Sequence, residues 1–230
     1  MYVPIREIKN EMGRNRFFVF SKRLNREVRL YNDLQYDHWC LVESNPLIIK
    51  YCEKPLRIVE TVAGEVIESI FDMWIQNVEG TEEYICVRHS YEVDLEHKRS
   101  KSLAIKELYA QRIWCAKNNK IHRLITEKEI RVNTVYLANI KTLLPYFTPL
   151  CQLDLTLNQL LLELVTESKY SIRQLENLIS NNYEITLIRK HIYNLIHHGI
   201  LEADICNCLI SGLTEVSISV SKEISREFTD

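Results

Sequence analysis

The order of apolar and polar residues divides the chain into a mixed first part and a helical last part. Residues 32–43 carry apolar side chains at helical spacing, and Asn45-Pro46 then ends the predicted helix. Runs rich in β-branched and aromatic residues follow and predict strands. These runs are residues 47–52, 56–61, 66–76 and 83–88. The pattern therefore predicts a helix followed by an antiparallel meander.

A second helix and a further strand complete this first part. Leu103, Leu108 and Ile113 recur at helical spacing in a helix expected over residues 102–118, and a short strand is expected at residues 122–126. Residues 133–146 form a last predicted helix, which ends near Pro145. Together these elements predict a mixed α/β core.

The pattern changes after residue 147. Leucines trace one helical stripe from Leu157 to Leu164, and Ser171 with Gln174 forms a capping box that opens a second helix. A third helix is expected over residues 185–198, and a hairpin is expected from residues 200–205 and 215–220. Three helices followed by a two-stranded wing is the winged-helix arrangement. We therefore expect two domains, at residues 1–147 and 148–230.

Composition narrows the possible settings. The 230 residues are 46% hydrophobic, which is ample for a packed core, and the net charge is −2. Because there is no overall basic excess, any contact with DNA has to come from local patches. The seven cysteines form no Cys-x-x-Cys pair, which favours reduced thiols over a disulfide framework. Without a long apolar run or a signal-like start, the chain is expected to be cytoplasmic and not membrane-bound.

A series of short motifs carries a family resemblance. In order, they are Leu34-Gln35-Tyr36-Asp37, Asn45-Pro46, Glu53-Lys54-Pro55, Phe71-Asp72-Met73 and Cys86-Val87-Arg88. The series resembles the N-terminal half of TnsA, the endonuclease subunit of heteromeric bacterial transposases, in which the matching motifs read like LERD, DP, EQP, PDF and E/Q-V-K. The resemblance implies a restriction-endonuclease-like sheet flanked by helices, followed by a winged-helix domain.

The resemblance also implies a site of the PD-(D/E)xK class, in which carboxylates on a helix and two strands bind Mg²⁺ and a lysine assists the attacking water. The matching positions here are Gln35, Asp72, Cys86 and Arg88, of which Asp72 alone keeps the family's residue. Gln35 offers no charge, Cys86 is a soft ligand, and Arg88 is permanently charged. Asp72 is thus the expected metal ligand, and activity requires Mg²⁺ if it survives.

Three further sets of residues have both functional and structural interpretations. Basic side chains of the last helices either line a DNA-facing surface or form a solvated face; these are Arg173, Arg189, Lys190 and His191, with His197 and His198. Within the charged run of residues 96–101, Lys98, Arg99 and Lys101 either contact a DNA backbone or lie in a solvated loop. Cys206 and Cys208, together with the two histidines, are either metal ligands or small thiols in a hairpin.

Three functional hypotheses follow from the sequence. The first is a TnsA-like subunit that binds transposon-end DNA and partner proteins, with endonuclease activity weak or lost. By resemblance, its partners are a DDE-family transposase like TnsB and an AAA+ ATPase like TnsC. The second is an active Mg²⁺-dependent endonuclease that cuts the non-transferred strands at the 5′ ends, with Asp33, Asp37 or Glu83 beside Asp72. The third is a non-enzymatic winged-helix regulator.

Overall fold

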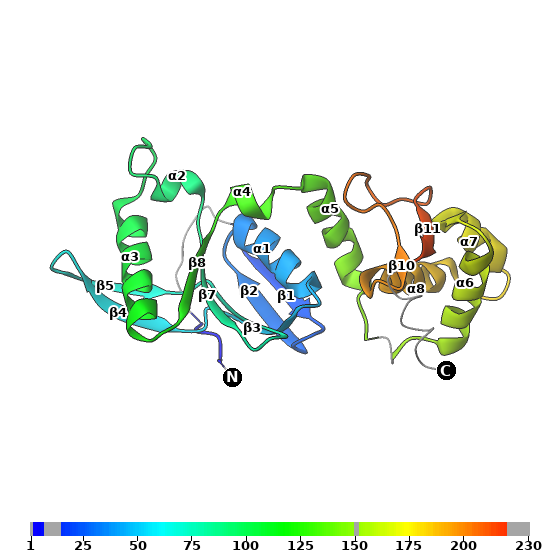
Figure 1. The fold of residues 1–230 in the computed structure, drawn as a ribbon, viewed down its shortest axis with the longest axis horizontal. Coiled ribbons are helices and arrows are strands. Elements are labelled where there is room, and N and C mark those ends of the chain that lie inside the picture. Colours follow the sequence, from blue (N-terminus) through cyan, green and yellow to red (C-terminus); the bar gives the residue numbers. More distant parts are fainter. Residues whose placement is uncertain (1, 7–14, 150–151, 220–230) are drawn as a thin grey trace. The chain divides into compact units, whose positions relative to one another are not determined.

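The computed structural model describes residues 2–6, 15–149 and 152–219, and they form a mixed α/β protein (Figure 1). The chain divides into two compact units, Met1–Val132 and Asn133–Asp230. The sequence predicts the boundary after residue 147, but the boundary between the two units is earlier, after Val132. It is earlier because Leu143 and Phe147 pack into the core of the second unit. No helix in the described ranges is long and apolar enough to cross a membrane.

A four-stranded mixed sheet is the centre of the first unit. Its strand order is β3-β6-β7-β8, with antiparallel pairs except for the parallel pair β7-β8. The strands are β3 (Ile48–Glu53), β6 (Met73–Asn77), β7 (Glu82–Val87) and β8 (Ile121–Ile125). Parallel neighbours require a crossover connection, and α3 (Ser102–Lys117) lies in the connection from β7 to β8.

The expected meander is wrong in its pairing. The run expected as one strand over residues 66–76 breaks at Phe71-Asp72, where the Phe71 amide donates to Leu56 O and the Asp72 amide donates to Ile85 O. Its first half, β5 (Glu65–Ile70), pairs with β4 (Arg57–Val62) in a separate hairpin, and its second half is β6. The β4-β5 hairpin lies against α3 (Figure 1). Consequently β3 pairs with β6 and not with β4.

Helix α1 (Asp33–Ser44) contacts β3 and β7 from one side of the sheet and carries the first of the family motifs. It forms where the sequence predicts it, because the Asn32 side chain caps its N-terminus by accepting from the Gln35 amide at 2.8 Å. Two short helices, α2 (Ser90–Val93) and α4 (Glu127–Ile130), follow β7 and β8 respectively.

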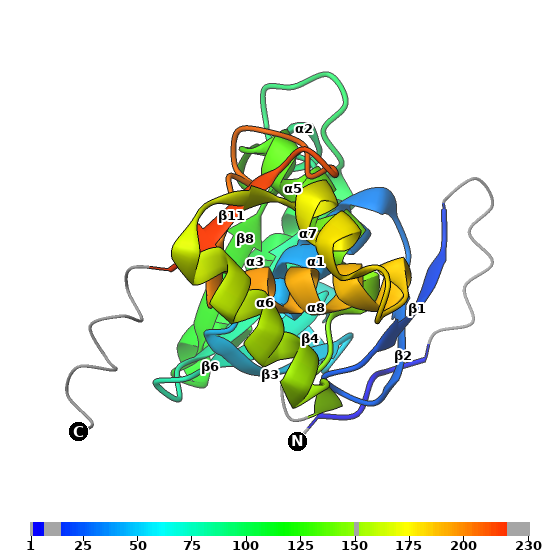
Figure 2. The same ribbon diagram turned by 90° about the vertical axis from the view of Figure 1, so that its right-hand side faces the viewer.

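A further hairpin, which the sequence analysis did not predict, precedes α1. It consists of β1 (Phe17–Ser21) and β2 (Arg26–Leu30) and forms its own two-stranded sheet (Figures 1 and 2). Val28 and Leu30 are buried on its inner face, and Ser21 Oγ donates to the buried carboxylate of Glu43 in α1 at 2.9 Å. This inner face therefore ties the hairpin to α1.

The second unit contains four α-helices within the described residues and a small sheet (Figure 2). Its elements are α5 (Thr134–Leu143), the 3-10 turn η1 (Leu144–Tyr146), α6 (Leu155–Glu167), β9 (Tyr170–Ser171), α7 (Ile172–Ile179), α8 (Ile185–His197), β10 (Leu201–Glu202) and β11 (Glu215–Ile218). The sheet is antiparallel in the order β10-β11-β9. The expected hairpin is present but shorter than its two runs, and residue 220 of the second run lies outside the described residues.

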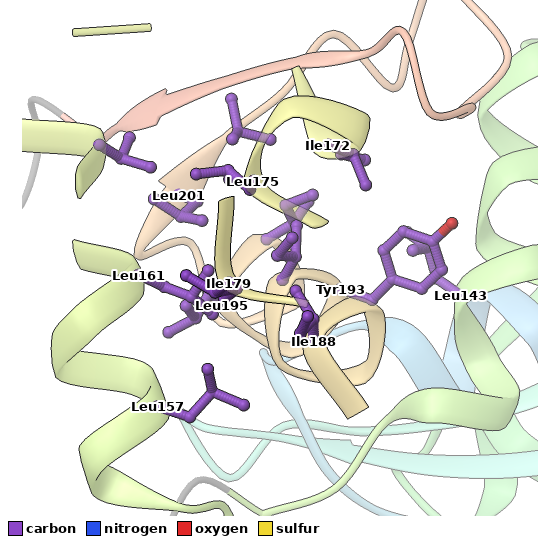
Figure 3. Packing of buried hydrophobic residues seen from close by; sticks show 14 of the residues in the cluster. Leu143, Leu157, Leu161, Ile172, Leu175, Ile179, Ile188, Tyr193, Leu195 and Leu201 are labelled. Atoms are coloured by element: carbon purple, nitrogen blue, oxygen red, sulfur yellow. The ribbon is translucent and has the colours of Figure 1, made fainter. Parts of the chain in front are cut away.

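Leucine and isoleucine side chains from α6, α7 and α8 converge in one core (Figure 3). Its fully buried members include Leu157, Leu161, Leu175, Ile188 and Ile192. The capping box predicted at Ser171 and Gln174 is confirmed, with the Ser171 amide donating to Gln174 Oε1 at 2.8 Å. The leucine stripe and the cap thus fix these helices as the sequence predicts.

Candidate functional site

Asp72 lies at the point where the chain passes from β5 to β6, close to the ends of α1 and β7. The Lys54 amide donates to Asp72 O at 3.1 Å, so Asp72 is joined by backbone hydrogen bonds to the segments on both sides. Lys54 itself has a φ of 45°, in the left-handed region that a lysine seldom adopts. Such backbone conformations persist only where the surrounding structure holds them.

Four donors surround the buried carboxylate of Asp72. Oδ1 accepts from Gln35 Nε2 at 2.8 Å and from Lys54 Nζ at 3.0 Å. Oδ2 accepts from the Val87 amide at 2.8 Å and from Arg88 Nη1 at 2.7 Å. The structure therefore brings together Gln35, Asp72 and Arg88, which lie far apart in the sequence and are three of the four positions of the expected site.

Gln35 and Arg88 are themselves held in place. Gln35 Oε1 accepts from the Tyr31 amide at 3.0 Å, which fixes the orientation of the side-chain amide and directs its NH₂ group toward Asp72. Arg88 Nη2 donates to Glu107 Oε2 of α3 at 3.1 Å. One guanidinium thus bridges two carboxylates, with a different Nη atom donating to each.

These contacts explain the ionisation of the site. Burial alone would raise the pKa of Asp72, but the charges of Lys54 and Arg88 and the Val87 amide outweigh it and hold that pKa below its usual value. The Asp72 carboxylate in turn raises the pKa of Arg88. Asp72 and Arg88 are therefore both charged at neutral pH, and they form an ion pair at short range.

Cys86, the remaining position of the expected site, is fully buried in β7. Burial raises the pKa of its thiol to about 12, so it is a neutral thiol at neutral pH. Because metal ligation requires the thiolate, Cys86 contributes no ligand in this state.

Asp72 and the side chains that contact it form part of the wall of a cleft of about 480 Å³ in the first unit. Gln35, Lys54, Asp72 and Arg88 line it, and Lys101 and Glu92 also contribute to its wall. Lys101 forms an ion pair with Glu92. Of the charged run that follows β7, Lys101 therefore lies at the cleft, whereas Lys98 and Arg99 are exposed in the loop.

The residues present do not fit Mg²⁺. A Mg²⁺ site needs several free oxygen ligands, but both oxygens of Asp72 already accept from charged or N–H donors. The alternative carboxylates are engaged elsewhere: Asp37 pairs with Arg131 and Glu83 with Arg123, while Asp33 accepts from Asn15. The described residues contain no group of three or more His, Cys, Asp or Glu side chains placed to hold a metal. The displaced ligand set is therefore not assembled around Asp72.

Sequence reasoning missed Lys54 and Glu107 as members of this cluster. Lys54 occupies the middle of the Glu53-Lys54-Pro55 marker, so its position was available from the motif, although its charge contact with Asp72 was not inferred. Glu107 lies on α3, outside every motif, and only the fold brings it to Arg88.

The expected DNA-facing residues of the second unit separate into three environments. Arg173 is exposed on α7, and Lys190 is partly exposed on α8. Arg189 is ion-paired with the buried Glu176 at 2.7 Å. His191 is 1% exposed and its Nδ1 lies 2.8 Å from Asn158 Oδ1, so the expectation that it faces DNA is wrong. Residues 191–196 of α8 are all buried, which leaves the first two turns of that helix for outside contacts.

The four possible zinc ligands are not gathered either. Cys206 and Cys208 are exposed free thiols, whereas the His197 ring stacks on Phe147 with centroids 3.6 Å apart. His198 Nε2 lies 3.3 Å from Thr148 O. The His197 and His198 rings thus contact Phe147 and Thr148 and are not grouped with the two cysteines.

Comparison with protein-family models gives no match for the chain, and comparison with curated proteins gives no significant one. The family resemblance therefore rests on the order of the motifs.

Proposed function

We propose that this chain is a TnsA-like subunit of a heteromeric DNA transposase, in which a nuclease-type site has become a structural ion-pair cluster with weak or lost cleavage. In this role the chain binds transposon-end DNA together with a TnsB-like transposase and a TnsC-like ATPase. The observation that carries the proposal is the set of contacts around Asp72, where Gln35 and Arg88 replace the family's Glu and Lys and contact the same carboxylate.

The fold supports the same proposal. In the first unit, α1 is followed by the antiparallel strands β3, β6 and β7, then by the crossover helix α3 and by β8, which is parallel to β7. This order is consistent with a restriction-endonuclease-like fold. In the second unit, the order α6, β9, α7, α8, β10, β11 is consistent with a winged helix, with the connection between β10 and β11 as the wing. We propose these two folds for the two units.

The chemistry explains why cleavage is expected to be weak. Phosphodiester hydrolysis in this class depends on metal ions that generate the nucleophile and stabilise the leaving oxygen. In this cleft Lys54 Nζ and Arg88 Nη1 instead lie within 3.0 Å of the Asp72 oxygens, and like charges repel an incoming divalent cation. What remains at the site is a fixed arrangement of cations and hydrogen-bond donors, suited to holding a phosphate without cutting beside it.

A nicking assay tests the proposal. Purified chain and its cognate transposase are incubated with end-labelled transposon-end duplex in Mg²⁺ or Mn²⁺, and both binding and 5′-strand nicking are measured. We expect binding without efficient nicking by the wild type. The triple variant Gln35→Glu, Lys54→Gln, Arg88→Lys restores the family's residues at these three positions, leaves Cys86 unchanged, and is expected to gain metal-dependent nicking.

The matched control makes the same three changes on or next to strands of the same sheet, as Gln76→Glu, Lys120→Gln and Arg123→Lys, and is expected to behave as wild type. Efficient nicking by the wild type that Asp72→Ala abolishes would overturn the loss of cleavage. Failure of the wild type to bind the duplex, with or without the transposase, would overturn the transposition role.

A further inference from the structure

The outer face of the β1-β2 hairpin carries two large aromatic side chains in solvent. Phe18 is 59% exposed and Phe20 is 61% exposed, while the inner-face residues Val28 and Leu30 are buried. The strand register places Phe18 opposite Arg29 and Phe20 opposite Glu27, so these four side chains share the outer face. Because neighbouring exposed aromatic side chains leave apolar surface in water, this face is suited to contact with a ligand.

A cation accompanies the first of these rings. The Arg29 guanidinium carbon lies 5.5 Å from the centre of the Phe18 ring, and Arg29 Nε donates to Glu27 Oε1 at 2.6 Å. An aromatic face beside a guanidinium can stack a base and contact the adjoining phosphate at the same time. The outer face of the β1-β2 hairpin therefore combines an aromatic ring that can stack on a base with a cation that can contact a phosphate.

The same face continues toward the cleft around Asp72. A hollow of about 200 Å³ is lined by Arg29, Tyr31 and Lys54, among others. Tyr31 and Lys54 also line the cleft, so the hollow and the cleft share these two side chains. Lys54 Nζ lies 5.5 Å from the centre of the Tyr31 ring. From the cleft outward, cations and aromatic rings thus follow one another as Arg88, Lys54, Tyr31, Arg29 and Phe18.

We propose that this path binds a single strand of DNA, with bases stacked on Phe18 and Phe20 and phosphates held by Arg29 and Lys54. The path leads an unpaired strand into the cleft at Arg88. This inference rests on the proposed function, because a subunit at a transposon end meets strands that are locally unpaired or already cut. It adds to that function a substrate form, the single strand, and a surface that binds it.

The chemistry favours a nucleic acid over a protein partner. An apolar protein interface is depleted of charge at its core, but here Arg29 and Glu27 lie directly across the strands from the two rings. The duplex fits less well, because stacking on Phe18 requires a base whose flat face is open.

Fluorescence anisotropy with a labelled oligothymidylate of about 15 nucleotides, within the usual site size, tests the proposal on the full chain. The double variant Phe18→Ser, Phe20→Ser is expected to lose binding by about tenfold or more, and Arg29→Gln by a smaller factor that shrinks as salt rises. An abasic oligonucleotide of equal length should bind the wild type weakly and should not distinguish it from the double variant.

The β4-β5 hairpin supplies matched controls. Val59→Ser with Val66→Ser removes two exposed apolar side chains, and Arg57→Gln removes an exposed arginine that is ion-paired with Glu68. Both controls are expected to bind as wild type. Circular dichroism establishes that each variant is folded.

Four results overturn the inference. Equal binding by wild type and the folded phenylalanine variant removes the stacking role, and equal binding of the abasic strand removes the role of the bases. A wild-type dimer that Phe18→Ser, Phe20→Ser converts to monomer, without oligothymidylate binding, assigns the face to a second copy of the chain. If the protein binds transposon-end duplex but not oligothymidylate, the inference fails while the proposed function stands.

Discussion

The guanidinium of Arg88 donates through Nη1 to Oδ2 of Asp72 at 2.7 Å, and this ion pair occupies the place where the family resemblance leads one to expect a carboxylate and its metal. The pair is shielded from solvent, with the Asp72 side chain 1% exposed and the Arg88 side chain 18% exposed. Arg88 also reaches Glu107, and Lys54 reaches the other Asp72 oxygen, so the cluster joins β3, β6, β7 and α3. A group that would be catalytic in a nuclease therefore contributes to stability.

That role predicts a large stability effect at Asp72. Asp72→Asn keeps the size of the side chain but leaves Lys54 without its partner carboxylate, and removing one partner of a buried ion pair costs about 3 kcal/mol or more. Urea denaturation should show this loss in the free energy of unfolding. The control is Glu83→Gln, which breaks the more exposed pair with Arg123 and should cost about 1 kcal/mol or less. Equal effects of the two changes would contradict the structural role of Asp72.

A second prediction concerns acid stability and His38 of α1. His38 is buried, its Nδ1 has no hydrogen-bond partner among the residues that the structure describes, and burial lowers its pKa to about 4. The nearby Asp72 charge opposes this lowering, and Arg123 adds to it. Because the unfolded chain binds this proton at a higher pH than the folded one, stability falls as pH decreases from about 6.5 to 4. A folded pKa near 4 makes the loss about 3 kcal/mol over that window.

Urea denaturation at a series of pH values measures this effect. His38→Leu should flatten the dependence of unfolding free energy on pH between 6.5 and 4, whereas the exposed His97→Leu should leave the slope as in wild type. His122, whose pKa burial also lowers to about 4, leaves a residual slope in the His38 variant. An unchanged slope in His38→Leu would contradict the buried neutral state of this residue.

The elements that the sequence predicted share a local cause. Helix α1 is specified by the Asn32 cap and by Asn45-Pro46, and α7 is specified by the capping box of Ser171 and Gln174. These signals act over a few residues, so a single sequence contains them. Of the site, the motif order predicted the residues Gln35, Asp72 and Arg88, which meet in the structure.

The remaining features depend on distant partners. The β4-β5 hairpin leaves the sheet because the chain breaks at Phe71-Asp72, where the hydrogen-bond partners Leu56 and Ile85 come from other strands. The β1-β2 hairpin escaped prediction because Phe18 and Phe20 point to solvent, which reverses the usual placement of aromatic residues. Lys54 and Glu107 join the site through contacts that no local pattern encodes.

His191 supplies a third prediction, since a residue type common on surfaces here packs inside the second unit. His191→Ala removes the hydrogen bond with Asn158 and leaves a cavity, so the second unit should lose about 2–3 kcal/mol of stability. Lys190→Ala, at the adjacent and more exposed position, should leave stability nearly unchanged and reduce affinity for duplex DNA. Thermal unfolding and DNA titration of both variants make the comparison. A normal melting temperature with weakened DNA binding in His191→Ala would restore the DNA-facing interpretation of this histidine.

Asn139 of α5 supplies the last prediction, because its side chain organises the connection between β10 and β11. Nδ2 donates to Ile205 O at 2.8 Å and to Cys208 O at 2.7 Å, and Oδ1 accepts from the Ile210 amide at 2.8 Å.

Asn139 is 1% exposed, so Asn139→Ala leaves these backbone groups without partners at a cost of about 1 kcal/mol each. A loss of about 3 kcal/mol in the local opening free energy speeds hydrogen exchange at the Ile210 amide roughly 100-fold or more. Mass spectrometry of exchange across residues 203–214 measures it, with the exposed Asn207→Ala as control. If exchange there stays at the wild-type rate in Asn139→Ala, the connection between β10 and β11 is held by contacts other than this side chain.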